Sequence, residues 1–595
     1  MRPVKIPQSD SPHPDPGSRA RYGRSLHLAF WLILVGAAVV RCAGLGSLPP
    51  PLNQDEASRG YDAWALLETG ADRHGAAWPF FLRSFGPGDY TAALSTYLTM
   101  PFVAILGPTP TAIRLPTAIL SVCTVAMLFA LVRRRLGDGP ALVAASILAL
   151  DPWHVGLSRT AHEAGFAPFF LILALLGLDR AGLWPADTES SAKPINPSAS
   201  RREQWVAAAF AGLGLACHAW VYPATRLFTP LFLAAYAILY RRPLKRMLDS
   251  PSQRVIVMAG FAGLIAGTTP LCMTAITHPE QLAARAQTVL LDPAAGRWPM
   301  LRNFTLNFAS DFSPRSLFWH SDDVTGVSLP GVGRHLPITA PLALAGLLGI
   351  VAQLRRDCTA RLLFAWLLLY PVPAAICGDW NPHPLRSVGG VLLYPVMCAM
   401  GVAVFTRRRV PFTADRLARR RRAAWRTIAA LALTVNGADA ARRYVRALTG
   451  DGAVGYQAAL HRAMAFVARH GQDADFVLVT NRCVQPYIYA LWVEPIAPNA
   501  LRGMDFAAVP GVKGFDNVVR VGRYYFVPKD PRDAAEAAAL FRKHWDKVPR
   551  TAIGLIIARC DEAGTGTLLA TFQTGSPDQG DCFGIWRASR SAITD

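Results

Sequence analysis

Two adjacent carboxylic acids, Asp55 and Glu56, stand in a polar segment soon after the first apolar run of the chain. Asn53 can cap a helix that starts here, because Glu56 follows it at the spacing of a capping box. On that helix Asp55, Arg59 and Asp62 fall at i, i+4 and i+7, so two carboxylates flank a guanidinium on one face. Such a face predicts acid–base chemistry; the alternative is a solvated surface with a capping acid.

A second polar group, Arg159, His162 and Glu163, occupies positions i, i+3 and i+4 where another apolar run begins. On a helix these three side chains would share one face. Ionisable groups at a membrane edge are costly to desolvate and usually face a cavity or a partner. The alternative is a plain ion pair between Arg159 and Glu163 that anchors the helix.

Four more polar side chains complete the set of candidate site residues: Arg83, Asp89, His383 and Arg386. Arg386 stands as a lone cation before an apolar run, and a guanidinium at headgroup depth suits a lipid phosphate. Headgroup anchoring is the alternative. The sequence has no P-loop, so no nucleotide-binding motif accompanies these residues.

The elements that position these residues belong to a membrane protein. The chain has 595 residues, 52% of them hydrophobic and 17% charged, which is too apolar for a soluble domain of this length. Its formal net charge of +21 is also typical of proteins that bind nucleic acid. The basic clusters fall in alternate loops, as the positive-inside rule requires, and this excludes a nucleic-acid-binding protein. They are 133–135, 201–202, 241–246, 355–356 and 407–422.

A spanning helix needs about 20 apolar residues, and eleven runs qualify as spans in a polytopic α-helical membrane protein. With residues 1–25 as a cytoplasmic arm and 26–441 as the membrane module, the segments 44–112, 277–335 and 442–595 lie outside. The predicted spans are 26–43, 113–132, 140–157, 164–182, 205–220, 223–240, 255–276, 336–353, 362–377, 388–405 and 425–441.

Two segments depart from this pattern. Leu94 to Leu106 is apolar, but a span there would invert the charge pattern, so we expect an amphipathic helix on the outer leaflet. Residues 442–595 have mixed polarity, which predicts a small extracytoplasmic α/β domain with a helix-like run at 456–469 and strand-like runs at 475–480, 524–527, 553–558 and 568–572. Its three cysteines, Cys483, Cys560 and Cys582, allow one disulfide with one cysteine left over.

Taken together, residues 26 to 405 resemble the GT-C superfamily, and within it family 39, the protein O-mannosyltransferases and lipid A aminoarabinose transferases. Three features carry the resemblance. They are the Asp55-Glu56 pair, the Pro-Trp-His…Ser-Arg…His-Glu turn that ends at Glu163, and His383-Pro-Leu-Arg386 before a late span.

The resemblance implies that Asp55 is the catalytic base and that Glu163 is the acid of the second outer loop. Many family members carry a lysine at the start of the interfacial helix that contacts the carrier phosphate. This chain has Thr91 at the apparent lysine position. The resemblance therefore leaves phosphate binding to Arg83, Arg386 or Arg59, with Glu56, Asp89, Arg159, His162 and His383 in support.

The hypothesis is an inverting transfer of a sugar from a polyprenyl-phosphate donor to an envelope acceptor at the outer face of a bacterial inner membrane. Asp55 would take the proton of the acceptor hydroxyl, and arginines would stabilise the departing phosphate. No cofactor is expected; a divalent ion held by Asp55 and Glu163 is the alternative to the metal-free version. The other functional alternatives are a flippase for lipid-linked glycans and an envelope polysaccharide polymerase or ligase.

Overall fold

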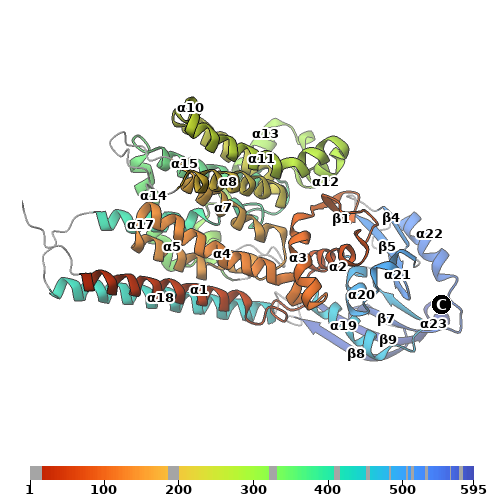
Figure 1. Ribbon diagram of the computed structural model, residues 1–595. Coiled ribbons are helices and arrows are strands. Elements are labelled where there is room, and N and C mark those ends of the chain that lie inside the picture. Colours follow the sequence, from red (N-terminus) through yellow and green to blue (C-terminus); the bar gives the residue numbers. More distant parts are fainter. Residues whose placement is uncertain are drawn as a thin grey trace, which may run out of the picture.

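The structure is a computed structural model of a helical bundle with an α/β domain at one end (Figure 1). Figure 1 shows the α/β domain next to α2 and β1, so the carboxyl-terminal domain and the first polar segment lie at the same end of the bundle. The structure describes residues 16–184, 200–320, 331–407, 416–449, 456–480, 484–503, 507–510, 515–528, 534–562, 565–574 and 581–594. Most of the predicted amino-terminal arm and Cys483 lie outside the described residues.

Each of the eleven predicted apolar runs is helical. Among the described residues, five helices are long and apolar enough to cross a membrane, or six if one bent pair counts as a single span. The bundle consists of α1 (Pro16–Cys42), α4 (Pro110–Leu136), α5 (Asp138–Leu150), α6 (Pro152–Ser158), η1 (Glu163–Phe166), α7 (Ala167–Arg180), α8 (Arg201–Val221), α9 (Pro223–Leu239), α10 (Arg241–Asp249), α11 (Pro251–Thr277), η4 (Pro337–Thr339), α14 (Ala340–Gln353), α15 (Cys358–Leu369), α16 (Val372–Ala375), η5 (Val388–Gly390), α17 (Leu393–Arg407) and α18 (Arg416–Thr449).

The predicted span 140–157 is divided into α5 and α6, which meet at an angle of 56°. The break falls at Asp151-Pro152, where Asp151 accepts a hydrogen bond from the backbone N–H of His154 and caps α6. Proline at the first position of α6 lacks the N–H that would continue the ladder of α5. The bend therefore follows from the local sequence.

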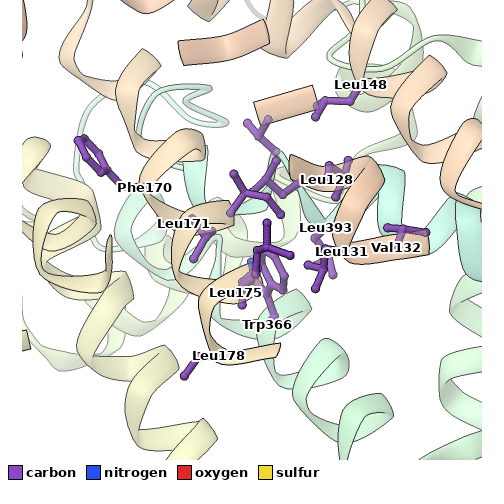
Figure 2. Packing of buried hydrophobic residues seen from close by; sticks show 14 of the residues in the cluster. Leu128, Leu131, Val132, Leu148, Phe170, Leu171, Leu175, Leu178, Trp366 and Leu393 are labelled. Atoms are coloured by element: carbon purple, nitrogen blue, oxygen red, sulfur yellow. The ribbon is translucent and has the colours of Figure 1, made fainter. Parts of the chain in front are cut away.

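Apolar side chains fill the middle of the bundle. Figure 2 shows Trp366 of α15 among leucines of α4, α7 and α17, including Leu128, Leu175 and Leu393, all of them buried. The indole N–H of Trp366 donates to the carbonyl of Gly389 at 2.6 Å, so the polar atom of this ring is satisfied inside the core.

Helices α8 and α11 approach each other through small residues. A Cβ added at Gly263 would lie 2.1 Å from the carbonyl oxygen of Ala209, and one added at Gly267 would lie 2.5 Å from the Cβ of Ala216. This close approach is the helix packing that Gly263-x-x-x-Gly267 predicts.

We expect Gly263→Leu to separate α8 from α11 and to destabilise the protein by about 1–3 kcal/mol, the usual cost of overpacking. Thermal unfolding in detergent measures the change. Gly36→Leu is the matched control, because a Cβ at Gly36 of α1 would meet nothing within 4 Å. Equal melting temperatures for the two variants would contradict this account of the α8–α11 contact.

The outer segments fold into short elements at the end of the bundle that carries the α/β domain. The interfacial helix is confirmed as a helix with the predicted bounds. Asp89 to Ala92 form a strand directly before this helix, so Thr91, at the apparent lysine position, stands on a strand. The elements are α2 (Gln54–Thr69), β1 (Phe81–Gly86), β2 (Asp89–Ala92), α3 (Leu94–Leu106), α12 (Pro279–Val289), η2 (Pro293–Ala295), α13 (Arg297–Ser310) and η3 (Arg315–Trp319).

The carboxyl-terminal residues form a seven-stranded mixed sheet in the order β4-β5-β6-β3-β7-β9-β8, in which β3 runs parallel to β6 and β7. Cys560 and Cys582 form the disulfide, one of the pairings that the sequence allows. The elements are α19 (Ala458–His470), β3 (Phe476–Val479), α20 (Tyr487–Val493), α21 (Pro498–Gly503), β4 (Ala507–Pro510), β5 (Asp516–Val521), β6 (Tyr524–Phe526), α22 (Ala534–Trp545), β7 (Ile553–Arg559), β8 (Thr567–Thr574), β9 (Asp581–Ser589) and α23 (Arg590–Thr594).

Candidate active site

Helix α2 starts with the predicted capping box. The side chain of Asn53 accepts from the backbone N–H of Glu56 at 2.9 Å, and the carboxylate of Glu56 accepts from the N–H of Asn53 at 3.0 Å. Glu56 is fully buried, and its second partner is Arg114 of α4, with Nε–Oε1 and Nη2–Oε2 distances of 2.8 Å. Burial alone would raise the pKa of Glu56, but the charge and hydrogen bonds of Arg114 outweigh it and lower the pKa. Glu56 therefore anchors the first turn of α2.

The neighbouring acid, Asp55, is partly exposed. Its side chain is 41% exposed, and its Oδ2 atom lies 3.9 Å from Nε2 of His162. Glu163 is buried on the other side of this imidazole, with Oε2 at 3.9 Å from Nδ1 of His162. Nη1 of Arg59 lies 3.2 Å from Oε1 of Glu163. The structure thus brings together four predicted site residues from two outer segments.

His162 is a neutral imidazole whose Nε2 atom lies on the side of Asp55, beyond hydrogen-bond distance. The backbone N–H of Ala164 points to Nδ1 of His162 at 3.4 Å, so Nδ1 carries the lone pair and Nε2 carries the proton. Burial, together with the charge of Arg59, lowers the pKa of His162 well below its usual value. Asp55 therefore stands next to a neutral imidazole and not next to a cation.

Arg159 lies elsewhere, and the predicted helical face with His162 and Glu163 is wrong. Helix α6 ends at Ser158, so helical spacing does not continue to Glu163. The guanidinium of Arg159 donates to three backbone carbonyls in and after the last turn of α1, at Val40 (2.6 Å), Ala43 (2.8 Å) and Leu48 (2.7 Å). Arg59 is the ion-pair partner of Glu163 in its place.

Asp62 also has a different partner from the predicted one. Its Oδ2 atom accepts from Nη1 of Arg73 at 2.7 Å, and both side chains are almost fully buried. Burial raises the pKa of Asp62 to about 7, against the opposing charge of Arg73. This pair fixes the loop after α2 to its helix, and Asp62 does not flank Arg59 in an exposed face.

Each of the three arginines predicted to bind phosphate is paired with an acid. Arg59 pairs with Glu163. Arg83 of β1 donates to Asp516 at the start of β5. Arg386 forms a two-pronged contact with Asp379, with Nη2–Oδ2 at 2.7 Å, so the description of Arg386 as a lone cation is wrong.

Two predicted supporting residues face the same region. Asp89 is partly buried, and burial raises its pKa to about 6 even though Arg285 opposes the rise. His383 is buried, its Nδ1 atom has no hydrogen-bond partner in the described part of the chain, and burial beside Arg386 lowers its pKa to about 3. The charge of Arg285 acts on His383 in the same direction as that of Arg386.

Arg285 of α12 is not among the residues predicted from the sequence. No carboxylate lies within ion-pair distance of Arg285 among the described residues, and its guanidinium lies over the ring of Phe515 at 5.9 Å. Its charge acts on Asp89, His162 and His383, and its helix packs against β2, the strand that begins at Asp89. A signal was present in the sequence: no acid stands three or four residues from Arg285 on its helix.

Arg226 of α9 is the second missed cation. Its guanidinium lies 4.8 Å from the ring centroid of Phe81, and its charge acts on Glu163. The Nε and Nη2 atoms are buried without a hydrogen-bond partner among the described residues. Donor atoms that are buried without a hydrogen-bond partner cost free energy. The charge of Arg226 adds to the positive potential around Glu163.

Comparisons with known proteins identify the fold. A family model described as dolichyl-phosphate-mannose-protein mannosyltransferase matches residues 91–182. The crystal structure of ArnT from Cupriavidus metallidurans in the apo state superposes with a TM-score of 0.51 at 11% identity, over 95% of this chain and 98% of that one. The chain has the GT-C fold.

Two further matches complete the comparison. ArnT from Cupriavidus metallidurans bound to undecaprenyl phosphate gives a TM-score of 0.50 at 11% identity, over 96% of this chain and 98% of that one. "Putative mannosyltransferase YycA" of Bacillus subtilis (strain 168) is 27% identical over 187 residues, or 31% of this chain. The match spans 25% of that relative's length.

The apolar helices make the chain a multi-pass membrane protein. The matched family segment contains Glu163 and His162 but neither Asp55 nor Arg285. In the described part of the chain, no group of three or more His, Cys, Asp or Glu side chains is placed to hold a metal ion.

The buried acid of this site should make stability depend on pH. Burial raises the pKa of Glu163 to about 7, although the charge of Arg59 opposes the rise. The folded protein therefore holds this proton more tightly than the unfolded chain, and the stability from this group falls as the pH rises from about 4.5 to about 7.

Glu163→Gln keeps the shape of the neutral acid at every pH. We expect its melting temperature, relative to the unmodified protein, to be higher at pH 8 than at pH 5 by roughly 2 °C. Thermal unfolding in detergent at the two pH values measures this difference. The same difference at both pH values would show that Glu163 is ionised throughout.

Proposed function

We propose that this protein transfers a sugar from a polyprenyl-phosphate carrier to an envelope acceptor at the outer face of a bacterial inner membrane. The observation that carries the proposal is the environment of Asp55. Glu56, Asp62 and Glu163 are each buried against an arginine, whereas Asp55 is exposed beside a neutral imidazole. It is the acid of this group that an acceptor can reach.

The proposed reaction is a single displacement. The acceptor hydroxyl loses its proton to Asp55 while its oxygen bonds to the anomeric carbon of the sugar. The bond from that carbon to the phosphate oxygen breaks, and its electron pair leaves with the polyprenyl phosphate. Attack from the face opposite the leaving group inverts the anomeric centre. Placement of the base contributes about 10²–10⁴-fold, and Arg285 and Arg226 supply charge where the phosphate departs.

Helix lengths support the proposed orientation. Arg114, which binds Glu56, stands near the start of α4, and the basic cluster Arg133 to Arg135 stands near its end. The 1.5 Å rise per residue separates Arg114 from Arg135 by about 30 Å, the thickness of the hydrocarbon core. The positive-inside rule puts the cluster in the cytoplasm and the site, with the α/β domain, in the periplasm.

Transport and polymerisation or ligation are the alternatives. Transporters hold ionisable groups near the middle of the membrane, at the interface of repeats. Here they gather where α2, β2, α12 and the α/β domain meet, so we do not propose transport. Nothing in the site favours a polymerase or ligase over transfer of one sugar.

The test is incubation of purified protein with a defined polyprenyl phosphosugar and envelope extract. We expect release of free polyprenyl phosphate only when acceptor is present, together with a new glycosylated product in mass spectra. Comparison of envelope lipids, glycans and secreted proteins from cells with and without the gene should show one missing sugar. Intact movement of the donor across vesicle membranes, with no carrier released, would contradict the proposal in favour of transport.

A further inference from the structure

The α/β domain shares an apolar core with the helix that carries Asp55. Ala57 and Tyr61 of α2 are buried, with exposed fractions of 0% and 1%, in the same cluster as Ile488 of α20 and Val477 of β3. Because side chains alternate along a strand, Val477 and Val479 face this cluster, whereas Phe476 and Leu478 face a separate one on the other side of the sheet. Helix α2 therefore packs on one face of the domain, beside α19 and α20.

Two hydrogen bonds tie α2 to the segment around α20. The indole N–H of Trp492 donates to the carbonyl oxygen of Ala57 at 2.8 Å. The hydroxyl of Tyr61 donates to the carbonyl oxygen of Ile496 at 2.6 Å. Both bonds lie within six residues of Asp55, so the domain contacts α2 in the turns that follow the proposed base.

The contact is close enough to require glycine at position 60. A Cβ there would lie 2.3 Å from Cδ1 of Ile113 in α4 and 2.9 Å from Cζ2 of Trp492. Glycine within a helix costs roughly 0.5–1 kcal/mol relative to alanine. The absence of a Cβ at Gly60 lets α2 lie between Ile113 of the membrane module and the indole of Trp492.

Helix α2 is thus restrained from two sides. Glu56 is bound to Arg114 of the membrane module, and Ala57 is bound to Trp492 of the α/β domain. The two contacts are made by the two residues that directly follow Asp55, and together they restrain the rotation of α2 about its axis. We propose that Trp492 is a positioning residue, through which the α/β domain holds Asp55 in line with the acceptor. This inference rests on the proposed function of Asp55.

The test compares two tryptophan variants of the full-length protein. Trp492→Phe keeps a ring and removes the N–H donor. Trp545→Phe is the matched control, because Trp545 is buried in the same domain but in the separate cluster with Phe476 and Tyr525. Small displacements of a catalytic group are costly, so we expect kcat of Trp492→Phe to fall about tenfold. The KM for donor and the melting temperature should stay unchanged, and Trp545→Phe should keep its kcat.

Hydrogen–deuterium exchange gives a readout that does not need activity. We expect faster exchange of the α2 amides in Trp492→Phe and unchanged exchange in Trp545→Phe. Unchanged kcat and unchanged α2 exchange in Trp492→Phe would overturn the inference, as would equal losses of kcat in both variants. Normal transfer by Asp55→Asn would instead overturn the proposed function, and the exchange result would then test the contact alone.

Discussion

Replacing Asp55 by asparagine should remove sugar transfer and leave the protein folded. The amide cannot take the proton of the acceptor hydroxyl, so the loss should reach the full contribution of a positioned base, about 10²–10⁴-fold in kcat. Because the side chain is 41% exposed and has no ion pair with an arginine among the described residues, the change should not disturb packing. Carrier release from a polyprenyl phosphosugar, at equal protein abundance, measures the effect.

The adjacent acid provides the matched control. Glu56→Gln weakens the buried contact with Arg114, which leaves a guanidinium in the core without a charged partner, so we expect lower abundance and a lower melting temperature. Asp55→Asn should show neither change. Near-normal transfer by Asp55→Asn would reject Asp55 as the base, and a loss that only follows protein abundance would give it a structural role like that of Glu56.

Local patterns predicted the elements of this protein well. Asn53 and Glu56 stand at the spacing of a capping box, and both halves of that box form. The interfacial helix from Leu94 to Leu106 has its predicted bounds. Both predictions succeed for one physical reason. A helix cap, like the spacing of apolar residues along a helix, depends on residues within one or two turns of each other, and these are near neighbours in the sequence.

Partners that are distant in the sequence were not predictable in the same way. Glu56 binds an arginine 58 residues away, and Arg83 binds Asp516, 433 residues away. Helical spacing suggested Arg159 as the partner of Glu163, but α6 ends before the spacing can act. The choice among several arginines for each acid depends on how loops fold back over the bundle, which a single sequence does not encode in any local pattern.

The α/β domain shows the same limit. Strands β3, β6, β7 and β8 follow runs that the sequence predicts, while β4, β5 and β9 were missed. Its composition suggested a separate unit, yet the cluster that contains Val477 also contains Tyr61 of α2. Burial of Tyr61 could not be distinguished from ordinary amphipathic spacing, because the surface that covers it begins more than 390 residues later in the chain.

Replacement of Arg285 should produce the second large effect. Helix α12 packs against β2, the strand that holds Thr91, where the related family places a phosphate-binding lysine. Arg285 has no carboxylate partner among the described residues, whereas Arg59, Arg83 and Arg386 are each paired. Its guanidinium is therefore the cation best able to take the place of that lysine. Removal of one charge-stabilising group from such a site costs about 10²–10³-fold in rate, and we expect this loss for Arg285→Ala.

The sequence suggested Arg83 as a phosphate-binding residue, whereas the structure favours Arg285. Arg83→Ala is therefore the control, because Arg83 binds Asp516 of the α/β domain. We expect it to retain most of its transfer rate. Carrier release should also recover in part when Thr91→Lys is added to Arg285→Ala, since the lysine would return a positive charge to the β2 side of the site. A larger loss of activity in Arg83→Ala than in Arg285→Ala would contradict this assignment. It would mean that the Arg83–Asp516 pair opens when the donor binds and that Arg83 of β1 binds the phosphate.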